Sequence, residues 1–225
     1  MMIKSKIIFK NYTQLLTYIL ISLSIIFIIS FTLVLPIFLN FTLQYSLSSF
    51  TLEHNIQDSI FTHLNENDIK QAQQEIINYY IFNEELSTEF FSDFEIIHYE
   101  DVKNILLVSS IVYLLFLILL VYTLLFQRSL VSKNNILKIS KISLIILLLC
   151  IPCIIFFEYF WRNIFHSLLF QEGTFQILQP QYISYYIYSE QFFLIIVGGV
   201  LIFQILLFST ILLYLKYIEK TENYL

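Results

Sequence analysis

Four long apolar segments constrain what this chain can fold into. Residues 15–39, 104–126 and 192–215 carry no charged side chain, and residues 142–161 contain only Glu158. A helix needs about 20 predominantly apolar residues to cross the hydrocarbon core of a bilayer. Because 58% of the 225 residues are hydrophobic and only 13% are charged, a soluble core cannot bury them all. The pattern predicts a mainly α-helical membrane protein with a bundle of four transmembrane helices.

The charged residues divide between the two sides of these predicted spans. Nine of the twelve Lys and Arg residues lie in residues 1–14, 127–141 and 216–225, whereas fifteen of the seventeen acidic residues lie in residues 53–101 and 158–190. Short basic segments stay on the cytoplasmic side. We therefore expect both termini and the 127–141 loop in the cytoplasm. The abundance of Ile, Phe, Tyr and Asn is typical of an A/T-rich bacterial genome, so a bacterial cytoplasmic membrane is expected.

The remaining segments, residues 40–91 and 162–191, are predicted to lie on the extracytoplasmic face. Apolar and polar residues alternate from Phe41 to Leu47, which predicts a short strand. Apolar residues then recur at helical spacing, which predicts an amphipathic helix from Asn67 to Phe82. Together these elements predict a small α/β cap over residues 40–91.

A capping box marks the start of the second membrane helix. In Ser92-Asp93-Phe94-Glu95 the serine and the glutamate have the spacing that satisfies the first backbone N–H groups of a helix. The helix should therefore begin outside the membrane, so that residues 92–126 form an outer extension and a span. Glu95, His98 and Asp101 share one face of this helix. We expect the two carboxylates to flank the imidazole and stabilise its protonated form, with Lys103 at the membrane boundary.

A second histidine follows the third span. Glu158, Arg162 and His166 are spaced by four, so they share a stripe if the helix continues past Trp161, and Arg162 is the expected partner of Glu158. His98 and His166 then reach a similar depth, near the ester groups of glycerolipids. This placement favours chemistry on a lipid ester. A purely structural role as interface histidines is the alternative, and a metal site is a weaker one because no HxxxH or HExxH pair occurs.

Other motifs are interpreted as structural. Cys150 and Cys153 lie in the middle of a predicted span, where a thiolate is poorly solvated, and Pro152 between them is expected to kink the helix. Gly198-Gly199 is expected to allow close helix packing. His54 and His63 lie among polar loop residues and are not expected to be functional.

Two stretches resemble a known family. The run from Phe90 to Lys103 contains Glu95, His98 and Asp101 and leads directly into an apolar helix. Phe165-His166 is followed by Phe170, by an aromatic-rich loop and by Phe192-Phe193. Both stretches resemble hallmarks of the lipoprotein intramolecular transacylases, bacterial membrane proteins with four spans and two outer loops, and the resemblance covers nearly the whole chain.

The resemblance implies a specific reaction. An enzyme of this family moves the sn-2 acyl chain of a diacylglyceryl-modified lipoprotein to the α-amine of its own N-terminal cysteine, which gives a lyso-form lipoprotein. His98 and His166 would be the catalytic pair, acting as general base and general acid. We expect Asp101 or Glu95 to orient His98, and Arg162 or Lys103 to stabilise the oxyanion.

The expected partners are diacylglyceryl lipoproteins and membrane lipid. No metal, organic cofactor or nucleic acid is expected to bind. From the residues alone, two other classes stay open. One is a non-enzymatic scaffold or a subunit of an envelope or transport complex, and the other is a lipid hydrolase at the outer surface.

Overall fold

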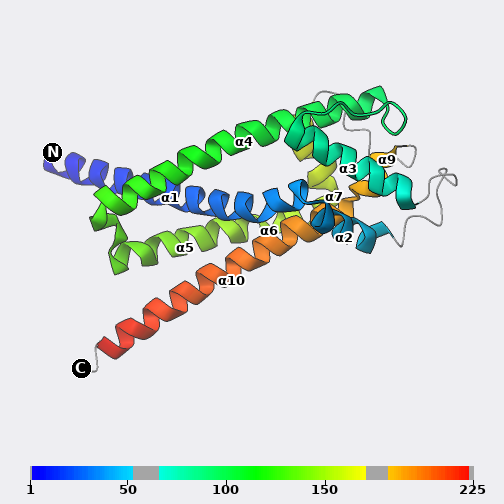
Figure 1. Cartoon of the computed structure of the whole chain (residues 1–225). Coiled ribbons are helices and arrows are strands. Elements are labelled where there is room, and N and C mark those ends of the chain that lie inside the picture. The colour runs from blue at the N-terminus through cyan, green and yellow to red at the C-terminus, as the bar shows by residue number, and fades with distance from the viewer. Residues whose placement is uncertain (1, 53–65, 171–181, 223–225) are drawn as a thin grey trace. The chain divides into compact units, whose positions relative to one another are not determined.

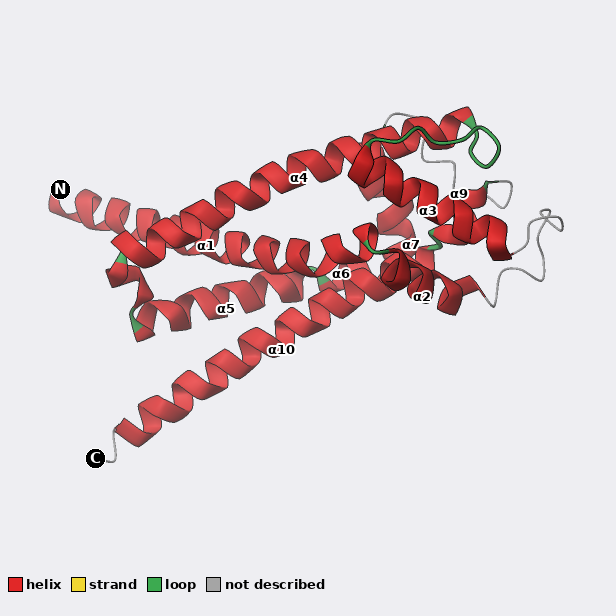
Figure 2. Ribbon diagram, viewed as in Figure 1, coloured by secondary structure: helices red, strands yellow, loops and turns green. Residues whose placement is uncertain are grey.

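A computed structural model describes residues 2–52, 66–170 and 182–222 of the chain. Within these ranges every regular element is helical (Figure 2). Four helices are long and apolar enough to cross a membrane, namely Tyr12–Leu39, Asp93–Phe126, Lys133–Ile155 and Glu190–Glu222. The prediction of a mainly α-helical protein with four spans is therefore confirmed. The predicted boundaries of tails, loops and spans stay predictions.

In chain order the elements are α1 (Met2–Leu39), α2 (Phe41–Leu52), α3 (Glu66–Phe82), α4 (Asp93–Phe126), the 3₁₀-helix η2 (Arg128–Val131), α5 (Lys133–Leu149), α6 (Ile151–Ile155), α7 (Phe157–Tyr159), the π-helix η3 (Phe160–Phe165), α8 (His166–Leu169), α9 (Ile183–Ile187) and α10 (Glu190–Glu222). They form two compact units. The first unit comprises residues 1–31, 111–151 and 200–225, and the second comprises residues 32–110 and 152–199. Helices α1, α4 and α10 contribute residues to both.

In the first unit, α1 packs against α5. Tyr18, Ile21 and Ile139 form its buried apolar cluster. The Tyr18 hydroxyl donates a 2.7 Å hydrogen bond to Asn135 Oδ1, and Ser22 Oγ donates to the Ile139 carbonyl. Few large apolar side chains in the membrane-spanning part of this unit are buried, and many are exposed. This is the pattern expected where lipid surrounds the helices.

The second unit holds the larger core. Figure 1 shows α2, α3 and α9 gathered together, and the three helices contact one another. Buried side chains of α3 and α9 form one apolar cluster with residues of α4, α10 and the adjoining loops, and Leu47 of α2 packs against it. The cluster consists of Ile69, Ala72, Ile76, Leu86, Phe91, Tyr99, Ile183, Tyr186, Ile187, Tyr188, Phe192 and Ile196. The predicted helix from Asn67 to Phe82 is confirmed as α3, which begins one residue earlier.

The predicted strand, and with it the α/β cap, is wrong. Residues Phe41–Leu52 form the helix α2, which begins after Asn40. Asn40 Oδ1 accepts a hydrogen bond from the Leu43 N–H and so caps the helix. The buried residues of α2 are Gln44 and Ser48, at i and i+4. The buried face of α2 is polar. The alternation of apolar residues along this segment therefore does not show which of its residues are buried, and it was no evidence for a strand.

The helix of the third span is interrupted next to Pro152, as predicted. Helix α5 ends at Leu149, and the Cys150 N–H donates to the Leu147 carbonyl in a tighter turn. Proline has no N–H to continue the helical ladder. The expected close packing at the glycine pair is not observed, because a Cβ added at Gly198 or Gly199 would meet no neighbouring atom within 4 Å.

Candidate active site

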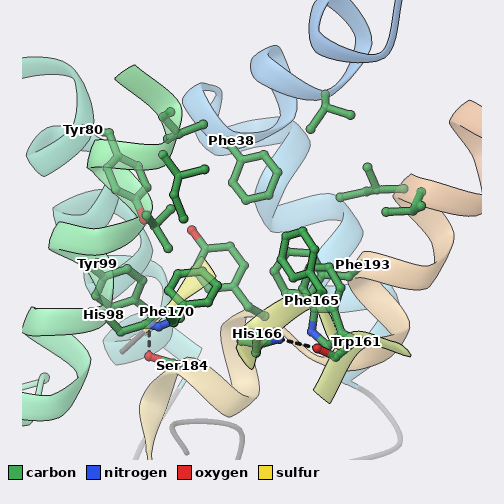
Figure 3. A pocket seen from close by; sticks show the side chains of 17 residues that line it. Phe38, Tyr80, His98, Tyr99, Trp161, Phe165, His166, Phe170, Ser184 and Phe193 are labelled. Atoms are coloured by element: carbon green, nitrogen blue, oxygen red, sulfur yellow. Dashed lines mark hydrogen bonds between the residues drawn. The ribbon is translucent and has the colours of Figure 1, made fainter. Parts of the chain in front are cut away.

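A cavity of about 270 Å³ lies within the second unit (Figure 3). Its polar lining groups are His98 and Tyr99 of α4, His166 of α8, Ser184 of α9, Tyr80 of α3, and the neighbouring Tyr188 and Trp161. The other lining residues are aliphatic or phenylalanine, and none of the lining residues that the structure describes is charged. The cavity is therefore an apolar space with a few polar groups, which is the usual composition of a small-molecule site.

The structure brings the two predicted histidines together in this cavity. His98 is 7% exposed and His166 is 3% exposed, and both line the cavity. Their ring centroids lie 6.1 Å apart, with an angle of 12° between the ring planes. The ring of Phe170 contacts both, with its centroid 4.4 Å from that of His98 and 5.1 Å from that of His166. Two imidazoles thus face the same small space.

The π-helix η3 sets the direction of His166. Both the backbone N–H and the ring Nδ1 of His166 hydrogen-bond to the carbonyl of Trp161, five residues earlier. The distance from Nδ1 to that carbonyl oxygen is 2.6 Å. Because a carbonyl oxygen can only accept, Nδ1 must carry the proton. In the neutral ring the lone pair is then on Nε2.

Burial lowers the pKa of His166 below its ordinary value of 6.5, although the bond to Trp161 acts in the opposite direction. Desolvation disfavours the imidazolium because it is charged. Burial therefore favours the neutral form of the His166 ring at physiological pH.

The predicted stripe of Glu158, Arg162 and His166 is wrong. The side chains of Glu158 and Arg162 are 73% and 48% exposed, whereas His166 is buried. The wider turn of η3 shifts His166 relative to the two earlier residues. The expected pairing of Arg162 with Glu158 is present at 3.8 Å, and Arg162 Nε also bonds to Glu190.

The capping box is confirmed, but Glu95 serves a different partner than expected. Glu95 Oε2 accepts 2.9 Å hydrogen bonds from the backbone N–H and the hydroxyl of Ser92. Its Oε1 accepts from the N–H of Ser184 at 3.0 Å and from the Ser184 hydroxyl at 2.6 Å. The two bonds from Ser184 fasten α9 to the first turn of α4. His98 Nδ1 has no hydrogen-bond partner among the described residues.

Ser184 links this carboxylate to the cavity. Because its hydroxyl donates to Glu95, it must accept the 2.6 Å hydrogen bond that joins it to the Tyr99 hydroxyl. Tyr99 and Ser184 both line the cavity. Sequence reasoning missed these two residues. The one signal for Ser184 in the sequence is its position within the aromatic-rich loop that follows Phe170.

The other predicted supporting residues do not line the cavity. Lys103 Nζ donates to the Tyr79 carbonyl at 2.8 Å and to Asn83, and it lies 4.0 Å from the centre of the Tyr79 ring. Asp101, like Arg162, is absent from the cavity lining. His54 and His63 lie outside the described residues. Within the described ranges, no group of three or more His, Cys, Asp or Glu could hold a metal ion.

Trp161 is a further lining residue that sequence reasoning did not single out. Its ring stacks on that of Phe165 and lies tilted against that of Phe193, with centroids 4.4 Å away in each case. It is 7% exposed, and its Nε1 has no hydrogen-bond partner in the part of the chain that the structure describes. An indole N–H is a donor only, and a buried donor without an acceptor is unfavourable. A ligand with an acceptor oxygen would relieve this cost.

The model of the lipoprotein intramolecular transacylase Lit family matches residues 18–193, a range that includes both histidines. The chain belongs to this family. It is therefore a multi-pass membrane acyltransferase. A search of curated proteins gives no match.

The Lit fold is also found among solved structures. The lipoprotein intramolecular transacylase Lit from Bacillus cereus superposes with a TM-score of 0.70 at 21% identity, over 94% of this chain and 99% of that one. A variant of the same protein with a histidine replaced by alanine superposes with a TM-score of 0.68 at 22% identity, over 98% of this chain and all of that one. Because the sequences are this different, the likeness concerns the fold.

Proposed function

We propose that this Lit-family enzyme moves the sn-2 acyl chain of a diacylglyceryl-modified lipoprotein to the α-amine of the same molecule's N-terminal cysteine. The reaction takes place between His98 and His166. The observation that carries the proposal is the pair of nearly parallel, buried imidazoles, 6.1 Å apart, in one apolar cavity.

The histidines divide the proton transfers. Nε2 of His166 removes a proton from the cysteine amine as its nitrogen attacks the sn-2 ester carbonyl. The new N–C bond forms, the bond from the carbonyl carbon to the glycerol oxygen breaks, and His98 donates a proton to that oxygen. His98 then regains a proton from the His166 imidazolium, so that both rings return to their neutral state. The products are an N-acyl amide and a free sn-2 hydroxyl. General acid–base catalysis of this kind is worth about 10²–10⁴-fold in rate.

Trp161 is proposed to donate to the oxyanion. Neither Arg162 nor Lys103 lines the cavity, whereas Trp161 does, and its buried Nε1 lacks an acceptor among the described residues. A donor that is already in place costs no reorganisation when negative charge develops on the ester oxygen.

Burial of the site favours transfer over hydrolysis. Both histidines are more than nine-tenths buried, and the surrounding lining is apolar. Water that reached the acyl group would compete with the amine, and an apolar site excludes it. The amine and the ester belong to one molecule, so the site only has to bring them together.

The proposed site lies on the extracytoplasmic face. His98 is the sixth residue of α4 and precedes the apolar run from Asn104 by six residues, which corresponds to about 9 Å along the helix. This depth suits an ester group between the headgroups and the acyl chains. The basic segments at residues 1–14, 127–141 and 216–225 support an orientation with both termini in the cytoplasm.

The test is expression in a bacterium whose lipoproteins carry a diacylglyceryl group and a free amine. Mass spectrometry of the N-terminal peptides should show one acyl chain on the amine and one on glycerol. His98→Ala and His166→Ala should each lower product formation at least 100-fold, in line with loss of a general acid or base. His63→Ala is the matched control and should be fully active. Full activity of both cavity variants would contradict the proposal.

A further inference from the structure

We infer that the apolar part of the cavity is a binding slot for the migrating acyl chain, and that Leu106 sets the chain length it accepts. The inference rests on the proposed transacylation, because it assigns the substrate's hydrocarbon to a place relative to His98 and His166.

The cavity is polar at the histidine end and apolar beyond it. On α4, Val102, Ile105 and Leu106 follow His98 by four, seven and eight positions, and all three line the cavity. Such spacing places them on one face of the helix. Leu106 therefore lies about 12 Å from His98 along the helix axis, toward the middle of the candidate span Asp93–Phe126.

Two other helices continue the same apolar lining. Ile196 and Val197 of α10 follow Phe193 by three and four positions, and Val34 of α1 precedes Phe38 by four. All five residues line the cavity. Figure 3 shows His98, His166 and Ser184 on one side of the cavity and Phe38 on the other. The side chains of these five residues carry no donor, acceptor or charge, so this part of the lining suits an apolar ligand.

The migrating chain is the occupant that this arrangement favours. The reaction requires the ester carbonyl to lie between the histidines. The chain attached to that carbonyl then continues directly into the adjoining space, whereas the retained chain is attached through the glycerol on the opposite side of the ester oxygen. Because acyl chains in a bilayer already lie in hydrocarbon, the slot cannot select by hydrophobicity. It selects by shape and length.

The experiment compares two substitutions at adjacent positions of α4. Leu106→Phe narrows the slot, and Leu107→Phe is the matched control because Leu107 is 60% exposed and does not line the cavity. Leu106→Ala widens the slot, and it tests the same proposal if the phenylalanine variant does not fold. The substrates are two synthetic diacylglyceryl lipopeptides in equal amounts, with the same sn-1 chain and with a decanoyl or a palmitoyl group at sn-2.

The measured quantity is the ratio of N-decanoyl to N-palmitoyl product by mass spectrometry. Relative to the unmodified enzyme, Leu106→Phe should raise this ratio at least tenfold, on the scale of steric discrimination in apolar pockets. Leu106→Ala should lower it, and Leu107→Phe should leave it unchanged.

An unchanged ratio in both Leu106 variants would overturn the slot. A second control varies the sn-1 chain of the lipopeptides and keeps the sn-2 chain constant. If the unmodified enzyme then selects substrates by the length of the sn-1 chain, the slot is overturned as well. If the unmodified enzyme forms no N-acyl product at all, the proposed function itself fails. The two failures are therefore distinguishable.

Discussion

Replacing Glu95 by glutamine removes a charge from the most heavily bonded side chain of the site. Each carboxylate oxygen of Glu95 accepts from one backbone N–H and one hydroxyl. The hydroxyls of Ser92 and Ser184 can rotate to accept from an amide NH₂, but the backbone N–H groups cannot. Glu95→Gln therefore leaves one backbone N–H, that of Ser92 or that of Ser184, without its acceptor in either amide orientation.

The cost follows from these bonds. Losing one charge-assisted hydrogen bond is worth about 1.5–3 kcal/mol, and the bonds that remain become neutral and weaker. We expect a total destabilisation of about 3 kcal/mol, which corresponds to a fall in Tm of roughly 6–12 °C for a protein of this size. Transacylation should fall as well, because Ser184 and Tyr99 line the cavity.

The assay is thermal unfolding of the purified protein in detergent, followed by tryptophan fluorescence. Trp161 is the only tryptophan of the chain and contacts the rings of Phe165 and Phe193, so its emission reports directly on the second unit. Asp93→Asn is the matched control, because it removes the same charge from the same first turn. Asp93 is exposed, so its loss costs only about 0.3–1 kcal/mol. Equal shifts in Tm for the two variants would refute the reasoning.

Two further predictions concern the reaction. Because burial lowers the pKa of His166, the base stays neutral down to below pH 6.5. As pH rises, kcat/KM should increase with an inflection near pH 8, the ordinary pKa of an α-amine, because the substrate amine must lose its proton before it attacks. An inflection at pH 6.5 would contradict a buried base. Trp161→Phe keeps an aromatic ring and removes the N–H, so kcat should fall about 10²–10³-fold. Unchanged kcat in that variant would exclude the indole as the oxyanion donor.

The sequence predicted the parts of this fold that depend on long-range patterns in composition. Apolar runs of about 20 residues or more indicate membrane-spanning helices, so the four spans were predictable. The capping box was predictable as well, because Ser92 and Glu95 satisfy each other locally. Helix α2 was not, because its buried face is made of Gln44 and Ser48, whose partners Tyr188 and Gln73 are distant in sequence.

At the site, the histidine pair was predictable and its surroundings were not. Helical spacing suggested that Glu95 serves His98, but Ser184 lies 89 residues away from Glu95 and binds it instead. The spacing of Arg162 and His166 misled for a different reason. A regular helix is the default when periodicity is interpreted, and η3 is not regular.

The wide turn of η3 makes the chain length before His166 as important as the residues themselves. A π-helix has the effect of one residue added to an α-helix, and each residue of an α-helix turns the next side chain by about 100°. Removing a single residue between Tyr159 and Phe165 would restore the ordinary ladder and turn the imidazole by about 100°. Such a deletion should therefore displace His166 from the cavity even though every residue that lines it is kept.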